Sequence, residues 1–157
     1  MKLHLLRHAK TKVLSISGKD IDRELAEKGL RQAIEMKAFL SKADWKKTLL
    51  LCSDATRTKQ TLENVTLPGQ FKAIEYTNEL YLAEAHQLKS LIAVQGNYDL
   101  FIIGHNDGLS ALAEELCSNS ICLKTCEYIE IECPGNDWSD IFIQKGRITA
   151  QFHPKVD

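Results

Sequence analysis

Three short apolar runs constrain the fold of this chain more than any other feature of its sequence. They are Leu3–Leu6 ("LHLL"), Thr48–Ser53 ("TLLLCS") and Leu100–His105 ("LFIIGH"). Continuous runs of this length are typical of strands that are buried on both faces, as in a parallel sheet covered by helices. Helical patterns separate the runs. The sequence therefore predicts an α/β fold, a three-layer α/β/α sandwich with a mixed, largely parallel central sheet.

The remaining pattern alternates between helix and strand and then changes in the last third. Leu30, Ala33, Ile34 and Ala38 recur at helical spacing and predict one apolar stripe on a helix that ends near Ser41. We expect other helices after the second run to about residue 65, around 88–92 and over 109–116, with a short strand at 71–76. Alternation near the C-terminus predicts strands at 128–132, 140–144 and 147–152, the last two forming a hairpin.

Length and charge exclude several classes of function. A chain of 157 residues, 44% of them hydrophobic and 26% charged, fits one soluble domain spanning 1–157. A net charge of -1 argues against a nucleic acid or an anionic membrane as partner. No apolar run is long enough to span a bilayer, and the N-terminus has no signal-peptide pattern, so we expect a cytoplasmic location.

The cysteines favour reduced thiols. There are five of them, an odd number, with no Cys-x-x-Cys pair, as in a cytosolic protein. Cys117, Cys122 and Cys126 lie close enough in sequence to raise the alternative of a zinc site, but their spacing matches no paired zinc motif. We therefore expect no metal, and Cys52, which ends an apolar run, fits a small core residue.

Residues able to hold an anion lie at or just after the end of each of the three apolar runs. These are Arg7 and His8 after the first, Ser53 and Arg57 after the second, and Gly104, His105 and Asn106 at the end of the third. Parallel strands end at the same edge of a sheet, where α/β folds bind ligands and where helix N-termini offer free N–H groups. Arginine suits phosphate because its planar fork binds two oxygens and keeps its charge. The sequence predicts a pocket for a phosphoryl group.

Each of these residues has a simpler interpretation when it is taken alone. Arg7 and His8 are also compatible with a solvated loop, Arg57 with an exposed helix position, and His105 with a histidine that caps its helix. Asn106 is better explained as a helix cap than as a phosphate donor. The phosphoryl pocket is favoured because these interpretations would require three independent coincidences at one strand edge.

Four segments in order resemble the histidine phosphatase superfamily, and in particular its compact SixA-like branch of phosphohistidine phosphatases. They are "LLRHAKT", "DIDRELAEKG", "SDATRTKQT" and "IIGHNDGLSALAEEL", and the later "WSDI" and "FHPK" extend the likeness over nearly the whole chain. The resemblance implies a phosphoglycerate mutase-like fold and a metal-independent hydrolase without a cofactor.

The resemblance also implies roles for individual residues. His8 would be the nucleophile that takes the phosphoryl group, and Arg7, Arg57 and His105 would bind its oxygens. Surrounding cations would keep His8 neutral, as a nucleophile must be. Arg23, in the Asp-x-x-Arg-x-Leu part of the second segment, is expected to bind substrate, whereas Lys10 fits either the rim of the pocket or a solvated position.

The chain departs from the wider superfamily at Leu82. Many members have a glutamate there that protonates the leaving alcohol, and neither Glu79 nor Glu84 matches its position, so the acid stays unassigned. We therefore expect a phosphorylated substrate such as a phosphohistidine protein. A phosphomonoesterase for small metabolites and a non-catalytic phosphate-binding module remain as alternatives.

Overall fold

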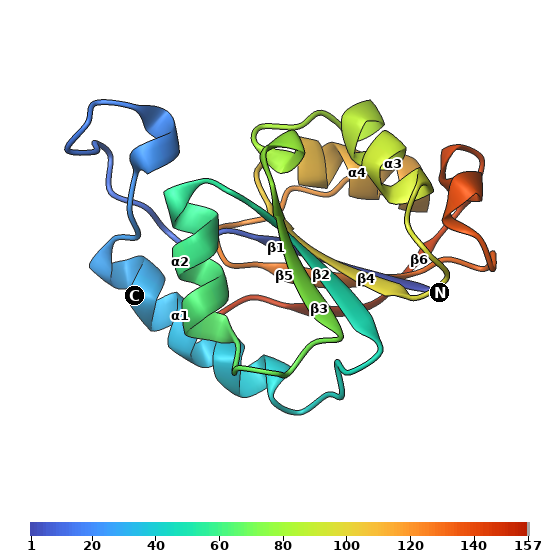
Figure 1. The fold of residues 1–157 in the computed structure, drawn as a ribbon, viewed down its shortest axis with the longest axis horizontal. Coiled ribbons are helices and arrows are strands. Elements are labelled where there is room, and N and C mark those ends of the chain that lie inside the picture. Colours follow the sequence, from blue (N-terminus) through green and yellow to red (C-terminus); the bar gives the residue numbers. More distant parts are fainter. Residues whose placement is uncertain (157) are drawn as a thin grey trace.

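A single sheet with helices on both faces organises residues 1–156, the part of the chain that the computed structural model describes (Figure 1). The strands are β1 (Lys2–Arg7), β2 (Thr48–Ser53), β3 (Ala73–Thr77), β4 (Asp99–Gly104), β5 (Tyr128–Glu132) and β6 (Arg147–Phe152). The helices are α1 (Glu27–Leu40), α2 (Thr56–Val65), α3 (Ala85–Ala93) and α4 (Gly108–Cys117), with short 3₁₀ helices η1 (Asp20–Asp22), η2 (Asn78–Leu80) and η3 (Trp138–Phe142).

The strand order confirms the predicted mixed sheet. It runs β3-β2-β4-β1-β5-β6, in which the first four strands are parallel and β5 and β6 are antiparallel at one edge. The three apolar runs are the three adjacent strands β2, β4 and β1. Each of these strands has another strand along both edges and an apolar core on both faces. Their central residues are therefore buried, as continuous apolar runs require.

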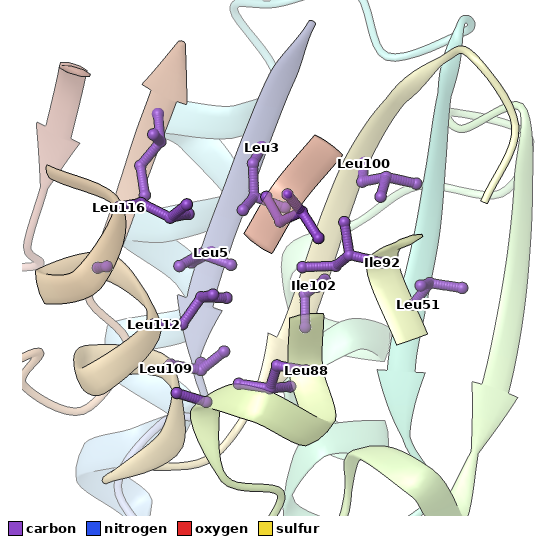
Figure 2. Close-up of a cluster of buried hydrophobic side chains, with 14 of the residues drawn as sticks. Leu3, Leu5, Leu51, Leu88, Ile92, Leu100, Ile102, Leu109, Leu112 and Leu116 are labelled. Carbon is purple, nitrogen blue, oxygen red and sulfur yellow. The ribbon is translucent and has the colours of Figure 1, made fainter. Parts of the chain in front are cut away.

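Two apolar cores make up the sandwich, one on each face of the sheet. Helices α1 and α2 cover one face, and α3 and α4 cover the other (Figure 1). Figure 2 shows the second core, in which Leu3 and Leu5 of β1 meet Leu109 and Leu112 of α4. Alternate residues of one strand thus enter opposite cores, since Leu6 packs in the first core instead. The predicted three-layer architecture is confirmed.

The predicted apolar stripe on α1 is wrong in its orientation. Leu30 and Ile34 are 42% and 67% exposed. The buried side of the helix carries Gly29, Gln32, Ala33, Met36 and Leu40. The helix is turned because Gly29 lies against the Lys10 carbonyl, where a Cβ would approach the oxygen to 2.1 Å. Close contact with the loop after β1 therefore outweighs the burial of two aliphatic side chains.

The predicted strand at 140–144, and with it the C-terminal hairpin, is also wrong. The first three residues of that segment belong to η3, where Trp138 and Ile141 are buried three residues apart. The Asp137 side chain accepts a hydrogen bond from the Ser139 N–H at the start of this helix. Helical spacing of the two buried residues thus overrides the local alternation. β6 pairs with β5 instead, so the antiparallel partners come from 128–132 and 147–152.

Candidate active site

The carboxyl ends of β1, β4 and β2 meet at one edge of the sheet and form a pocket of about 340 Å³. The residues predicted from the strand ends line it together: Arg7, His8, Arg57, His105 and Asn106. Arg23 and Lys10 line it as well, from the loop after β1. All of the predicted site residues are thus brought to one place. The lining is completed by Thr11, Asp20, Leu82 and Thr125.

Backbone contacts hold the loop that carries His8. The His8 N–H donates to the Gly104 carbonyl at 3.1 Å, and the Ala9 N–H donates to the Thr61 hydroxyl at 3.0 Å. The Lys10 N–H donates to the Gln32 side chain of α1 at 2.9 Å. Helix α1 therefore turns its polar Gln32 inward in order to fix this loop.

The hydrogen bond of the His8 ring sets its tautomer. Nδ1 lies 2.8 Å from the Ala9 carbonyl oxygen, which can only accept, so Nδ1 carries the proton. Nε2 then holds a lone pair, and it makes no hydrogen bond within the described residues of this pocket wall. A neutral imidazole with a free Nε2 is the form that can act as a nucleophile.

The environment keeps both pocket histidines neutral. Burial is the largest cause, and with the positive charges of Arg57 and Arg7 it lowers the pKa of His8 to about 4, although the bond to the Ala9 carbonyl acts in the opposite direction. Burial, followed by Arg57 and His8, lowers the pKa of His105 to about 3. The predicted neutrality of His8 is therefore obtained, but burial contributes more to it than the cations do.

These pKa values give an expected titration. Between pH 7 and pH 5 the His8 ring should stay neutral, and it should gain a proton only as the pH falls towards 4, because the charged form is disfavoured. Imidazole carbon and proton shifts in NMR spectra, assigned with a His8→Asn variant, measure this directly. Titration of His8 near the unperturbed value of about 6.5 would contradict the described burial.

Buried nitrogen atoms without partners cluster around the pocket. Arg7 Nε, Arg57 Nε and His105 Nδ1 are buried and make no hydrogen bond within residues 1–156. Buried polar groups are nearly always hydrogen-bonded, so unsatisfied donors at one pocket point to an absent acceptor. His105 Nε2 lies 2.8 Å from the Ser53 hydroxyl, which leaves its Nδ1 for such a ligand. A group rich in oxygen, such as phosphate, fits these donors.

Asp20 and Tyr81 are residues that the sequence analysis did not place in the site. Asp20 accepts hydrogen bonds from Arg57, Arg23 and the Tyr81 hydroxyl. These donors, Tyr81 first, hold the pKa of the Asp20 carboxyl well below its usual range. The Asp-x-x-Arg pattern was a signal for Asp20, because it placed Arg23 in the site, whereas nothing in the sequence indicated Tyr81. Ser53, expected among the anion-binding residues, is not among the residues that line the pocket, and its hydroxyl contacts His105 Nε2 instead.

Asn106 does not cap helix α4, contrary to the preferred interpretation of the sequence. The helix begins at Gly108, and the Asn106 side chain instead donates to the Leu123 carbonyl at 3.0 Å and accepts from the Ser110 hydroxyl at 2.8 Å. Arg7 Nη1 donates to the same carbonyl at 2.8 Å. Asn106 therefore ties the segment around Leu123 to α4 beside the pocket.

The glutamates left open as acids lie elsewhere. Glu84 is the N-cap of α3, where its side chain accepts a backbone N–H in a capping box, and Glu79 lines a different hollow beside His86. Leu82 lines the pocket in a left-handed conformation with φ of 51°. The segment that carries Leu82 packs closely against Gly108, where a Cβ atom would lie 1.8 Å from the Ala83 carbonyl oxygen. Among the described residues, Asp20 is the one carboxylate that lines this pocket.

The three clustered cysteines do not converge. Cys122 is exposed, whereas Cys126 is buried, and all five cysteines are free thiols. Within residues 1–156 no group of three or more histidine, cysteine or acidic side chains lies close enough to bind a metal ion. Helices in the same range are all too short or too polar to cross a bilayer.

The chain is an α/β/α sandwich with a cationic pocket at the carboxyl edge of its parallel strands, which is where open α/β sheets bind their ligands. The sequence profile of the histidine phosphatase superfamily (branch 1) matches residues 3–89, over half of the chain. The chain belongs to the histidine phosphatase superfamily.

Three proteins illustrate what this chain is similar to. The solved structure of a protein named SixA from Nakamurella multipartita has a TM-score of 0.84 at 22% identity, covering 98% of this chain and 96% of that one. An uncharacterised chloroplastic protein of Arabidopsis thaliana is 32% identical over 92% of this chain and 72% of its own length. Mouse fructose-2,6-bisphosphatase TIGAR is 34% identical over 50% of this chain and 30% of TIGAR. The family match supports phosphatase activity, and the likeness to the solved structure shows a shared fold.

Proposed function

We propose that this protein is a metal-independent phosphatase that works through a covalent phosphohistidine on His8 and removes phosphate from phosphohistidine in proteins. The observation that carries the proposal is the state of the His8 ring. Its Nδ1 proton is held by the Ala9 carbonyl, its Nε2 is free, and burial lowers its pKa to about 4. A positioned neutral imidazole of this kind is a competent nucleophile near pH 7.

The reaction has two transfers of the phosphoryl group. The Nε2 lone pair of His8 attacks phosphorus while the bond from phosphorus to the leaving atom breaks, and the leaving atom keeps that electron pair. Water then attacks the phosphohistidine, the N–P bond breaks towards Nε2, and inorganic phosphate leaves with both protons of the water. The proton on Nδ1 of His8 stays there throughout, hydrogen-bonded to the Ala9 carbonyl oxygen.

Two arginines and the neutral His105 provide the electrostatic part of the reaction around His8. Arg7, Arg57 and His105 have buried nitrogens without partners at the pocket, so they bind the phosphoryl oxygens and stabilise charge as it shifts. Arg23 and Asn106 lie at the wall of the pocket and extend the binding site for the substrate. Positioning and charge stabilisation are sufficient for phosphoryl transfer by this route.

The substrate class follows from the pocket lining of residues 1–156, which holds no carboxylic acid that is ready to donate a proton. Leu82 stands where a glutamate would protonate a leaving alkoxide, and Asp20 is held ionised by Tyr81 and its arginines. An alkyl phosphate needs such an acid, because an alkoxide is a poor leaving group. Phosphohistidine that is protonated on its other ring nitrogen releases a neutral imidazole. The site therefore favours P–N bonds over unactivated P–O bonds.

The corresponding experiment compares substrates side by side. We expect kcat/KM for a phosphohistidine peptide to exceed that for phosphoserine or glycerol phosphate by at least about tenfold, which corresponds to roughly 1.4 kcal/mol of barrier. Aryl phosphates with acidic phenols should fall between them. Equal or higher rates on alkyl phosphates would contradict the proposed substrate class.

A substitution at Leu82 tests the reason for this preference. Leu82→Glu restores a carboxyl group at the pocket, so turnover of alkyl phosphates should rise at least about tenfold while that of aryl phosphates changes little. Leu67→Glu is the matched control, because Leu67 is also half-exposed but does not line the pocket. An unchanged preference in Leu82→Glu would show that another feature sets it.

A phosphomonoesterase for small metabolites is the second candidate. The sequence similarity to TIGAR over 50% of this chain favours this candidate, since that relative is named for a sugar bisphosphate. The substrate comparison separates the two candidates directly.

A cytoplasmic location is part of the first proposal, and the free thiols of all five cysteines fit a reducing compartment.

A further inference from the structure

Arg57 is held at one end of its guanidinium group by Asp20. Its Nη1 donates to the Asp20 backbone carbonyl at 2.9 Å, and its Nη2 donates to the Asp20 carboxylate at 3.0 Å. Arg57 is 3% exposed, so the orientation of its head group depends on these partners. The two contacts come from one residue and fix the plane of the guanidinium as well as its position.

The other side of the same guanidinium has no partner. Arg57 Nε is buried and makes no hydrogen bond within residues 1–156. A guanidinium group has five N–H donors and can bind two acceptors, one along each of two edges. Asp20 contacts only Nη1 and Nη2. The edge that contains Nε is therefore left for a second, bidentate acceptor.

Asp20 is itself held from several directions. Arg23 Nη1 donates to Oδ1 at 3.0 Å, and the Tyr81 hydroxyl donates to Oδ2 at 2.6 Å. The Tyr81 ring also lies under the Arg57 guanidinium, 5.8 Å from Cζ, and contacts the His105 ring edge-on at 5.5 Å. This network links the loop at 20–23 to two of the groups proposed to bind phosphate.

We propose that Asp20 is a positioning residue for the phosphoryl transfer: it clamps the Nη end of Arg57 so that the Nε edge is presented to the phosphoryl group. This inference rests on the proposed function, because it names how one of the phosphate-binding groups is oriented. Asp20 touches neither the substrate nor His8 and acts through Arg57. The alternative, in which Asp20 is an anion that phosphate must displace from Arg57, predicts the opposite change in phosphate affinity.

Asp20→Asn tests the clamp because it keeps the size of the side chain and removes its charge. We expect the dissociation constant for inorganic phosphate, measured by titration calorimetry, to rise at least about threefold and kcat/KM on an aryl phosphate to fall at least about tenfold. Asp22→Asn is the matched control, since Asp22 lies two residues away and is exposed, and its side chain accepts a hydrogen bond from Ser17 rather than from Arg57. It should stay within about twofold of the native protein in both measurements.

A double-mutant cycle separates positioning through Arg57 from a structural role. In an Arg57→Lys background the guanidinium edges are gone, so adding Asp20→Asn should change phosphate affinity by less than about twofold. Asp20→Glu, which keeps the carboxylate, should recover part of the lost activity. Thermal melting of each variant checks that the fold is intact.

The outcomes divide clearly. Three results would each overturn the proposed positioning role of Asp20. They are unchanged phosphate affinity in Asp20→Asn, tighter binding of phosphate by that variant, and an effect of Asp20→Asn that persists in full without Arg57. Phosphate binding needs no turnover. A native protein that binds phosphate but hydrolyses no substrate would therefore refute the proposed function and still leave the clamp measurable.

Discussion

His8→Ala should abolish turnover of every phosphorylated substrate. The variant loses the Nε2 lone pair that forms the covalent intermediate, and removing a nucleophile of this type lowers kcat by at least about 10⁴-fold. The fold should persist, because the loop is held by the His8 and Ala9 backbone N–H groups rather than by the ring. Steady-state assays and a thermal melt on the same sample measure both effects.

His8→Asn provides the control for loss of volume. It fills more of the space left by the ring but offers no nucleophile, so it should be as inactive as His8→Ala. A variant of either kind that retains activity would refute the covalent mechanism. A native protein that is equally inactive on every substrate would favour the non-catalytic binding module instead.

Arg57→Ala is expected to have the second largest effect. The substitution removes the buried Nε edge and leaves Asp20 without one of its two arginine partners, so kcat/KM should fall by about 10²–10³-fold. It should also raise the pKa of His8, because the positive charge of Arg57 is one of the causes that lower it. Kinetics and the NMR titration of His8 measure the two changes independently.

Arg57→Lys separates charge from geometry at this position. Lysine keeps the positive charge but lacks the planar fork, so the His8 pKa should stay low while kcat/KM still falls at least about tenfold. Full activity in Arg57→Lys would show that charge alone is needed. It would also remove the basis for an oriented Arg57.

The central part of the fold and site was predictable because it depends on local sequence. The buried strands β1, β2 and β4 show as continuous apolar runs, and the residues after them must meet at the carboxyl edge of a parallel sheet. That rule of topology brings Arg7, Arg57 and His105 together without any knowledge of side-chain contacts.

The errors come from contacts between distant segments. The apolar pattern of α1 suggested that Leu30 and Ile34 are buried, but Gly29 and Gln32 face inward to hold the loop at Lys10. The alternation at 140–144 suggested a strand, but η3 buries Trp138 against the α3 and α4 side of the sheet. In both cases a tertiary contact outweighs the local pattern.

The roles of Asp20 and Tyr81 were missed for a related reason. Asp20 reaches Arg57 across 37 residues of sequence, and Tyr81 reaches Asp20 across 61. An acidic residue in a polar loop is typical of a solvated position, and no spacing rule links it to a helix that begins at Thr56. Such a network becomes apparent only when the segments are placed in space.

Trapping of the phosphorylated protein is the direct test of covalent catalysis by His8. The native chain is mixed with ³²P-labelled phosphoramidate or aryl phosphate, quenched within milliseconds in alkali, and digested for mass spectrometry. We expect a phosphoryl group on His8 that survives alkali and is lost in acid, and no adduct in His8→Ala. Rapid turnover with no adduct at any time, or an adduct on a residue other than His8, would contradict it.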